Sequence, residues 1–191
     1  MRAILGVMLF LTFGTSLPIH KQYDSIKDKS WKKCAFSYGI HDKYHLFKNS
    51  QDFLDSKEAI LKALNLWATE VKIIKLYEVH DDQQQPDIDI TFALRDHNCT
   101  ESFDGPGGIV AHSAYPPHGI LHFDAEEVWS LDGDNLNLSY VALHELGHVL
   151  GLKHSEEPKS IMNSIYRNGP LRLSGQDIRR LRRLFAYCNR V

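Results

Sequence analysis

Residues 144–154 read HELGHVLGLKH, and this stretch decides how the whole chain is interpreted. Residues four positions apart lie on one face of an α-helix, so His144 and His148 can bind the same metal ion. Gly151 accepts the left-handed backbone conformation in which helices often end, so the chain can turn back there. That turn brings in His154 as a third ligand, and the stretch therefore predicts a zinc ion held by three imidazoles.

Glu145 adds a base to this predicted site. It follows His144 directly and can reach a water molecule on the metal. Zinc with three protein ligands keeps one position open and lowers the pKa of its water toward neutrality, so that a nearby carboxylate can take the proton and create a nucleophile for a peptide carbonyl. The alternative is a helix with unrelated histidines. At ordinary residue usage, the fixed residues of the stretch would arise together by chance in roughly fewer than one chain in ten thousand of this length.

The stretch resembles the signature of the metzincins, a superfamily of zinc proteases. Metzincins also carry a methionine turn beneath the zinc, and residues 160–163 read SIMN, with Met162 at a suitable distance after the third histidine. The residue after His154 is Ser155, which is typical of the matrix metalloproteinases, whereas other metzincin branches carry Glu or Asp there. The resemblance therefore favours the matrix metalloproteinases over another metzincin branch.

A second motif, FDGPGG at residues 103–108, also resembles the matrix metalloproteinases. In that family it lies among the ligands of a structural zinc and a calcium ion. The implied structural zinc ligands are His97, Cys99, His112 and His122. The implied calcium ligands are the carboxylates of Asp104, Asp124 and Glu127 and the carbonyl groups of Gly105, Gly107 and Ile109, an oxygen set of the kind that calcium prefers. The alternative is a turn cluster with incidental histidines.

Some positions depart from the family pattern. Cys99 stands where the family has an Asp ligand of the structural zinc, and a thiolate can replace that carboxylate because it is a good zinc ligand. Ile120 stands where a second calcium site has a carboxylate, so we expect that site to be absent. Asn98 and Asn137 begin glycosylation sequons, and a glycan at Asn98 would crowd the zinc loop.

The N-terminal residues have the pattern of a targeting segment. Residues 1–16 combine an early Arg, an apolar run over 3–13 and small residues near Ser16, which predicts a cleaved signal peptide and a secreted, extracellular protein. A buried N-terminal helix is the alternative. The apolar run is too short to span a bilayer, so we expect no membrane anchor. The remaining chain divides into a short segment over 17–30, a catalytic domain over 31–187 and a tail over 188–191, with neither the family's inhibitory propeptide nor its haemopexin-like domain expected.

Charge and cysteine content narrow the function classes. The formal net charge of −2 gives no reason to expect binding to nucleic acid. The basic run RRLRR at residues 179–183 is interpreted as the solvated face of an amphipathic helix, with a polyanion site as the alternative. Three cysteines in a secreted chain allow one disulfide and leave one thiol over. The resemblance makes Cys34 and Cys188 the candidate pair, since their elements are neighbours in related domains, and leaves Cys99 unpaired.

The rest of the chain alternates between strand and helix patterns. Apolar residues at Ile60, Leu64, Trp67 and Val71 predict an amphipathic helix over 57–71, with Ser56 as its N-cap. Strands are predicted over 35–40, 73–79, 88–94, 109–113 and 120–123, and further helices over 139–150 and from Ser174 onward. This order predicts one α/β domain of the metzincin (zincin-like) type, with a twisted, mostly parallel sheet and three helices.

These features together predict a secreted zinc metalloendopeptidase that cleaves extracellular or matrix proteins. An extended substrate should pair its backbone with the edge strand over 109–113. The resemblance implies that Tyr140 lines the pocket for the side chain after the cleaved bond, with Tyr166 on the opposite wall. We expect a monomer that acts on protein or peptide substrates and has tissue inhibitors of metalloproteinases as partners. A secreted metal-binding decoy is the alternative from another class, but a decoy has no need of Glu145.

Overall fold

The computed structural model describes residues 6–11, 30–80, 85–99, 101–131, 136–167 and 169–190. The helices are α1 (Ser50–Val71), α2 (Leu138–Val149) and α3 (Gly175–Leu184), followed by a 3-10 helix, η1 (Ala186–Arg190). The strands are β1 (Gly6–Leu11), β2 (Ala35–His41), β3 (Lys75–Glu78), β4 (Ile88–Ala93), β5 (Gly108–Ala114), β6 (Ile120–Asp124), β7 (Trp129–Ser130) and β8 (Leu136–Asn137). None of the helices in the described ranges has the length and apolar composition that a membrane crossing requires.

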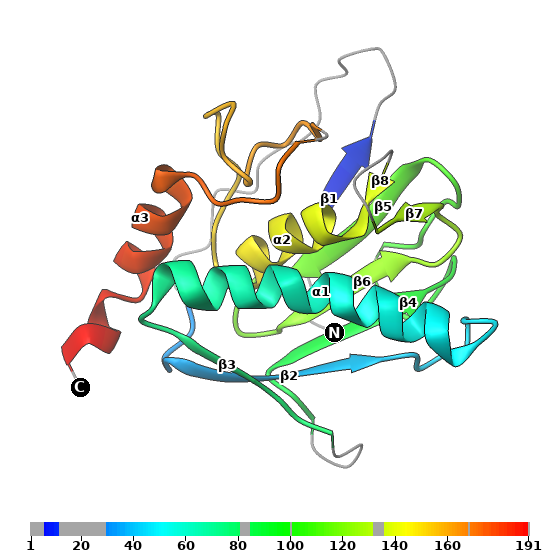
Figure 1. The fold of residues 1–191 in the computed structure, drawn as a ribbon, viewed down its shortest axis with the longest axis horizontal. Coiled ribbons are helices and arrows are strands. Elements are labelled where there is room, and N and C mark those ends of the chain that lie inside the picture. Colours follow the sequence, from blue (N-terminus) through cyan, green and yellow to red (C-terminus); the bar gives the residue numbers. More distant parts are fainter. Residues whose placement is uncertain are drawn as a thin grey trace.

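The main sheet is mixed, with the strand order β1-β5-β6-β4-β2-β3. The pairs β2–β3, β2–β4 and β4–β6 are parallel, whereas β5 runs antiparallel to both β6 and β1. The helices α1 and α2 lie side by side across the sheet, and α3 lies near the end of α1 (Figure 1). The predicted mostly parallel sheet with three helices is therefore confirmed.

The long helix α1 supplies much of the core. Its residues Ile60, Leu64, Trp67 and Val71 are all buried, as the helical spacing predicts. The indole N–H of Trp67 donates to the carbonyl oxygen of Leu143 at 2.9 Å. This hydrogen bond connects α1 to the middle of α2.

The predicted start of α1 was wrong. The helix begins at Ser50, and its N-cap is Asn49, whose side chain accepts from the backbone N–H of Asp52 at 2.9 Å. Ser56 lies inside the helix and donates its hydroxyl to the carbonyl oxygen of Asp52 at 2.8 Å. A serine hydroxyl can cap a helix or bond back to a carbonyl four residues earlier, and the cap at Asn49 decides between these uses here.

The last helix, α3, begins as the sequence predicts. Ser174 is its N-cap, and Asp177 completes a capping box. Two arginines of the basic run on this helix donate hydrogen bonds to backbone carbonyl groups of neighbouring segments. Arg182 donates to the carbonyl oxygens of Glu70 and Val71 at 2.8 and 3.1 Å, which satisfies free carbonyls at the end of α1. Arg180 donates to the carbonyl oxygen of Lys153 at 2.6 Å. These contacts favour the structural interpretation of the run over a polyanion site.

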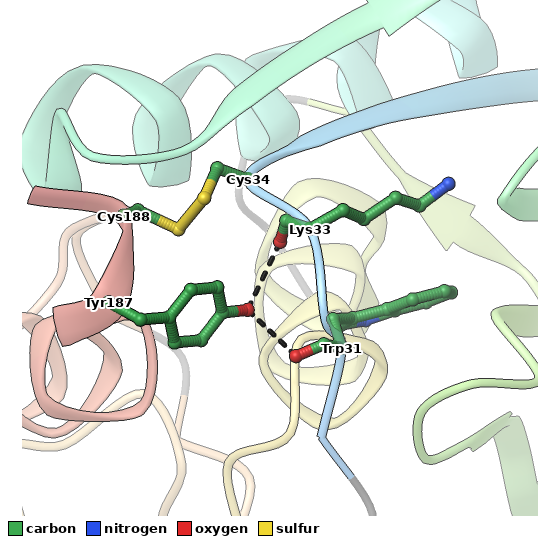
Figure 2. Close-up of a disulfide and its surroundings, with 5 residues drawn as sticks. All are labelled: Trp31, Lys33, Cys34, Tyr187 and Cys188. Carbon is green, nitrogen blue, oxygen red and sulfur yellow. Dashed lines mark hydrogen bonds between the residues drawn. A yellow bond between two sulfur atoms is a disulfide. The ribbon is translucent and has the colours of Figure 1, made fainter. Parts of the chain in front are cut away.

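A disulfide joins the two ends of the domain (Figure 2). It links Cys34, just before β2, to Cys188 in η1, with Cα atoms 5.8 Å apart, and leaves Cys99 as a free cysteine, so the predicted pairing is confirmed. Beside it, the hydroxyl of Tyr187 lies 2.7 Å from the carbonyl oxygen of Trp31 and 3.1 Å from that of Lys33. The first and last parts of the domain are thus held together by covalent and polar contacts.

Part of the predicted signal peptide forms a strand. β1 pairs antiparallel with β5, with the Cα atom of Met8 opposite that of His112. The predicted edge strand over 109–113 is therefore the second strand of the sheet, with β1 on its outer side. The rest of the predicted signal peptide, residues 17–29 of the short segment, Thr100 of the first sequon and residue 191 of the tail lie outside the described residues.

Candidate active site

The helix α2 presents two of the predicted zinc ligands on one face. The Nε2 atoms of His144 and His148, one helical turn apart, lie 3.0 Å from each other. The helix then ends, and Gly151 adopts a φ of 108°, the positive φ that its predicted turn requires. The turn brings the ring of His154 to within 5.3 Å of His144 and 4.7 Å of His148, centroid to centroid. The structure thus brings all three histidines together, with ligand atoms within 4.8 Å of one another.

The helix histidines are oriented for metal binding by their other ring nitrogens. The Nδ1 atom of His144 lies 2.6 Å from the carbonyl oxygen of Ile161, and that of His148 lies 2.6 Å from the carbonyl oxygen of Leu152. A carbonyl oxygen can only accept, so each Nδ1 carries the proton and each Nε2 presents a lone pair. Burial, with repulsion from the neighbouring His154, lowers the pKa of His144 to about 3. Burial also holds the pKa of His148 well below its usual value, and both rings are therefore neutral at pH 7.

Glu145 is fully buried beside His144. Its Oε2 atom accepts a hydrogen bond from the hydroxyl of Ser113 in β5 at 2.6 Å. Its Oε1 atom is buried and has no hydrogen-bond partner among the described residues. Burial raises the pKa of Glu145 to about 8, against the opposing effect of the Ser113 hydrogen bond. An unpaired buried acceptor costs free energy unless another group fills it, and a water molecule on a metal would do so.

Met162, the methionine of the predicted turn, packs against α2 at Gly147, the residue before His148. Its side chain is fully buried, and a Cβ atom at Gly147 would lie 2.2 Å from its Sδ atom. Glycine at 147 is therefore needed for α2 to pack this closely on Met162. Asp177 at the start of α3 holds the turn, because its carboxylate accepts from the hydroxyl of Ser160 and, at 3.1 Å, from the backbone N–H of Ile161.

The second predicted zinc set also comes together. His112 and His122 are paired opposite each other on β5 and β6, with the His112 Nε2 atom 3.2 Å from the His122 Nδ1 atom. His97 brings its Nε2 atom to 3.2 Å from the His112 Nε2 atom, and the Sγ atom of Cys99 lies 3.3 Å from the His122 Nδ1 atom. All four ligand atoms lie within 4.8 Å of one another. Burial, with repulsion between the rings, lowers the pKa of His112 to about 4 and that of His122 to about 3. Neutral imidazoles with a thiol form a donor set that fits zinc.

The predicted calcium carboxylates surround one glycine-rich loop. The carboxylates of Asp104, Asp124 and Glu127 accept from the backbone N–H groups of Ile109, Gly105 and Gly107, at 3.0, 3.2 and 2.6 Å respectively. These hydrogen bonds of the backbone N–H groups hold the loop around the three carboxylates, and calcium binding by the carbonyl groups of Gly105, Gly107 and Ile109 stays a prediction. Burial, and then the charges of Asp124 and Asp104, raise the pKa of Glu127. Mutually repelling carboxylates in a half-buried loop favour a cation, and their oxygens fit calcium.

Tyr140 and Tyr166, the residues predicted to line the specificity pocket, are neighbours. Tyr140 lies in α2, one turn before His144, and its ring contacts that of Tyr166, which follows the methionine turn. The hydroxyl of Tyr166 accepts from the backbone N–H of Asn137, the N-cap of α2, at 2.9 Å. Both side chains are thus placed beside the start of the metal-binding helix.

A comparison with protein families identifies the family of the domain that carries these clusters. The family model described as Matrixin matches residues 30–186, which covers nearly all of the domain that carries these clusters. The chain belongs to the matrixin family. The match agrees with the predicted metzincin-type fold.

Individual relatives of this matrixin show the same relationship. The macrophage metalloelastase of Rattus norvegicus is 38% identical over 161 residues, covering 81% of this chain and 33% of the relative. The stromelysin-1 of Equus caballus is 38% identical over 165 residues, covering 81% of this chain and 32% of the relative. The neutrophil collagenase of Homo sapiens is 37% identical over 139 residues, covering 71% of this chain and 28% of the relative. The chain therefore spans about a third of the length of these curated relatives.

Two residues of this matrixin touch the site without having been predicted to do so. The first is Ser113, whose hydroxyl meets Glu145, and the second is Asp177, which was predicted only as part of the α3 start and also holds the methionine turn. A signal for Ser113 existed in the sequence. Side chains alternate along a strand, so a residue next to the predicted ligand His112 must face the opposite side of the sheet.

Proposed function

We propose that this matrixin is a secreted zinc endopeptidase that hydrolyses peptide bonds in extracellular or matrix proteins. The observation that carries the proposal is the buried, unpaired Oε1 atom of Glu145 beside three converging histidines. A proton acceptor next to three histidines supports this proposal, because three imidazole ligands have the composition of an open, catalytic zinc site. Family membership supports the same activity.

Each residue has a distinct part in this reaction. His144, His148 and His154 would hold the zinc, which when bound supplies a Lewis acid and an acidified water. Glu145 would accept a proton from the attacking water at Oε1 and later return a proton to the leaving amine. The carbonyl oxygens of Ile161 and Leu152 keep the helix histidines in the tautomer that binds metal. Met162 packs against Gly147 of α2 and would take no part in proton transfer.

The other two clusters have structural roles in this proposal. His97, Cys99, His112 and His122 would hold a second zinc, a closed site with four protein ligands. The carboxylates of Asp104, Asp124 and Glu127 would hold calcium together with the carbonyl groups of Gly105, Gly107 and Ile109, whose backbone N–H groups donate to the same carboxylates and hold the loop around them. Both ions would stiffen the segment that leads into β5.

The substrate of the processed chain would lie along β5. Removal of residues 1–16 exposes the backbone hydrogen-bonding groups of this strand, and β1 itself demonstrates that an antiparallel segment fits there. Two of the relatives carry the names metalloelastase and collagenase, which supports fibrous matrix proteins as the substrate class. Tissue inhibitors of metalloproteinases would be partners that bind along the same strand, and we propose that the secreted enzyme works as a monomer.

One assay separates this function from a metal-binding decoy. The processed chain, folded with zinc and calcium, is incubated with an internally quenched fluorescent peptide, with and without a chelator. We expect the peptide to be cleaved. A chelator should abolish this cleavage, and added zinc should restore it. A chain that binds zinc but never cleaves any peptide of a broad library would instead be a decoy.

A further inference from the structure

The strand β5 faces both metal clusters at once. His112 and Ser113 are consecutive, so their side chains point to opposite sides of the sheet. His112 joins the second cluster, whereas the hydroxyl of Ser113 reaches across to α2 and donates to the Oε2 atom of Glu145. The register of β5 on β6 fixes both directions, because Ser113 lies opposite Leu121 and His112 lies opposite His122.

The contact between Ser113 and Glu145 is shielded from solvent. Ser113 is 1% exposed and Glu145 is 0% exposed, so water cannot readily replace the hydroxyl. The oxygen atoms are 2.6 Å apart, within the range of a hydrogen bond to a charged acceptor. Among the described residues, this is the one hydrogen bond that the Glu145 carboxylate accepts, and Oε1 is left unpaired.

A glutamate side chain has three rotatable bonds, and its carboxylate must hold one orientation if it is to accept a proton from a neighbouring atom. A donor fixed on a strand can supply that orientation, because strands hold side chains more rigidly than loops do. Ser113 meets this requirement: it occupies one carboxylate oxygen and leaves the other available for the proton.

We propose that Ser113 is a positioning residue for Glu145, which rests on the proposed role of Glu145 as the general base. It acts on the rate of the chemical step through the orientation of the carboxylate and does not bind substrate or metal. Removing the hydroxyl should therefore lower kcat and leave both KM and the zinc content unchanged.

A double-mutant cycle tests this role in the processed chain, with and without the Glu145→Ala change. Ser113→Ala should lower kcat about tenfold when Glu145 is present, the size of effect expected for loss of one ordinary buried hydrogen bond. The same change should have no further effect when Glu145 is already Ala. Equal losses in both backgrounds, a rise in KM, or no loss of kcat would each overturn the proposal.

A matched control is available at the other side of the sheet. Ser37 is a buried serine on β2 whose hydroxyl lies 3.1 Å from the Oδ2 atom of Asp87, so Ser37→Ala also removes a serine–carboxylate contact. It should leave kcat unchanged, and a loss equal to that of Ser113→Ala would overturn the specific role of Ser113. The failure of the proposed function is distinguishable, since it would appear as near-native turnover in the Glu145→Ala chain alone.

Discussion

The rings of Tyr140 and Tyr166 meet edge to face, with their centroids 5.1 Å apart and their planes at 76°. One ring comes from α2 and the other from the segment after the methionine turn, so the contact closes the space between these two elements. In the matrix metalloproteinases, which this chain resembles, those positions border the pocket for the side chain that follows the cleaved bond. A closed contact there favours a shallow pocket.

The first prediction concerns specificity. The processed chain should prefer Leu or Ile after the cleaved bond over long aromatic side chains. Tyr140→Leu should raise the cleavage of peptides with longer side chains at that position by about tenfold, which is the usual effect of a few contacts in a hydrophobic pocket. Profiling a peptide library on both chains measures this. Tyr77→Leu, at a half-exposed position on β3, is the matched control and should leave the profile unchanged. If Tyr140→Leu gains no activity toward longer side chains, Tyr140 only packs in the core.

The second prediction concerns the base. Glu145→Ala should retain the zinc held by the three histidines, because Glu145 is not among the converging ligand atoms. Turnover should fall on the order of 100-fold to 10,000-fold, the usual worth of a general base. Metal analysis and steady-state kinetics on the same preparation provide the measurement. Near-native turnover in this variant would contradict the proposed mechanism.

The third prediction concerns the free thiol. The purified processed chain should contain zinc in both clusters, and Cys99→Ala should weaken the second zinc while the first stays bound, because the thiol lies among the second cluster's ligand atoms. Cys99→Asp should restore much of the affinity, since it keeps an anionic ligand at that position. Zinc competition titrations followed by metal analysis report both sites. Undiminished affinity in the Cys99→Ala chain would show that the thiol is not a ligand.

The fourth prediction concerns calcium. Its removal should lower the thermal midpoint and change kcat much less, because Asp104, Asp124 and Glu127 hold a loop and do not contact Glu145. A ligand present at about 100 times its Kd stabilises the folded state by about 2.7 kcal/mol. Thermal unfolding with and without calcium tests this, with Glu127→Gln as the variant that should reduce the response. An unchanged midpoint in the wild-type chain would argue against the site.

The sequence predicted the site best where the geometry is local. The spacing of His144 and His148 on one helix and the glycine turn at 151 are set by residues close in the chain, and the structure has both features. The start of α1 was misplaced because Asn49 and Ser56 are both of residue types that cap helices, and the exposed first turn at Gln51 and Asp52 lacks the apolar spacing that identifies the rest of the helix. Local pattern alone cannot make that choice.

Long-range contacts were harder to foresee. Ser113 and Glu145 are 32 residues apart in the sequence, and their meeting depends on which face of β5 turns toward α2. The hydrogen bonds from the backbone N–H groups of Gly105 and Gly107 to carboxylates likewise depend on the path of the loop. The sequence resemblance implies metal ligands in this loop but does not describe its backbone path. The pairing of β1 with β5 lay inside a segment whose composition predicts a signal peptide, and composition carries no information about strand partners.

The disulfide between Cys34 and Cys188 has a practical consequence for a protease that can cut itself. The two cysteines are 154 positions apart in the sequence, so the disulfide spans almost the entire domain. A single internal break in this interval produces two fragments that stay covalently attached. Self-digestion would therefore escape detection on a non-reducing gel, and only a reduced sample would show how much of the purified protein is already nicked.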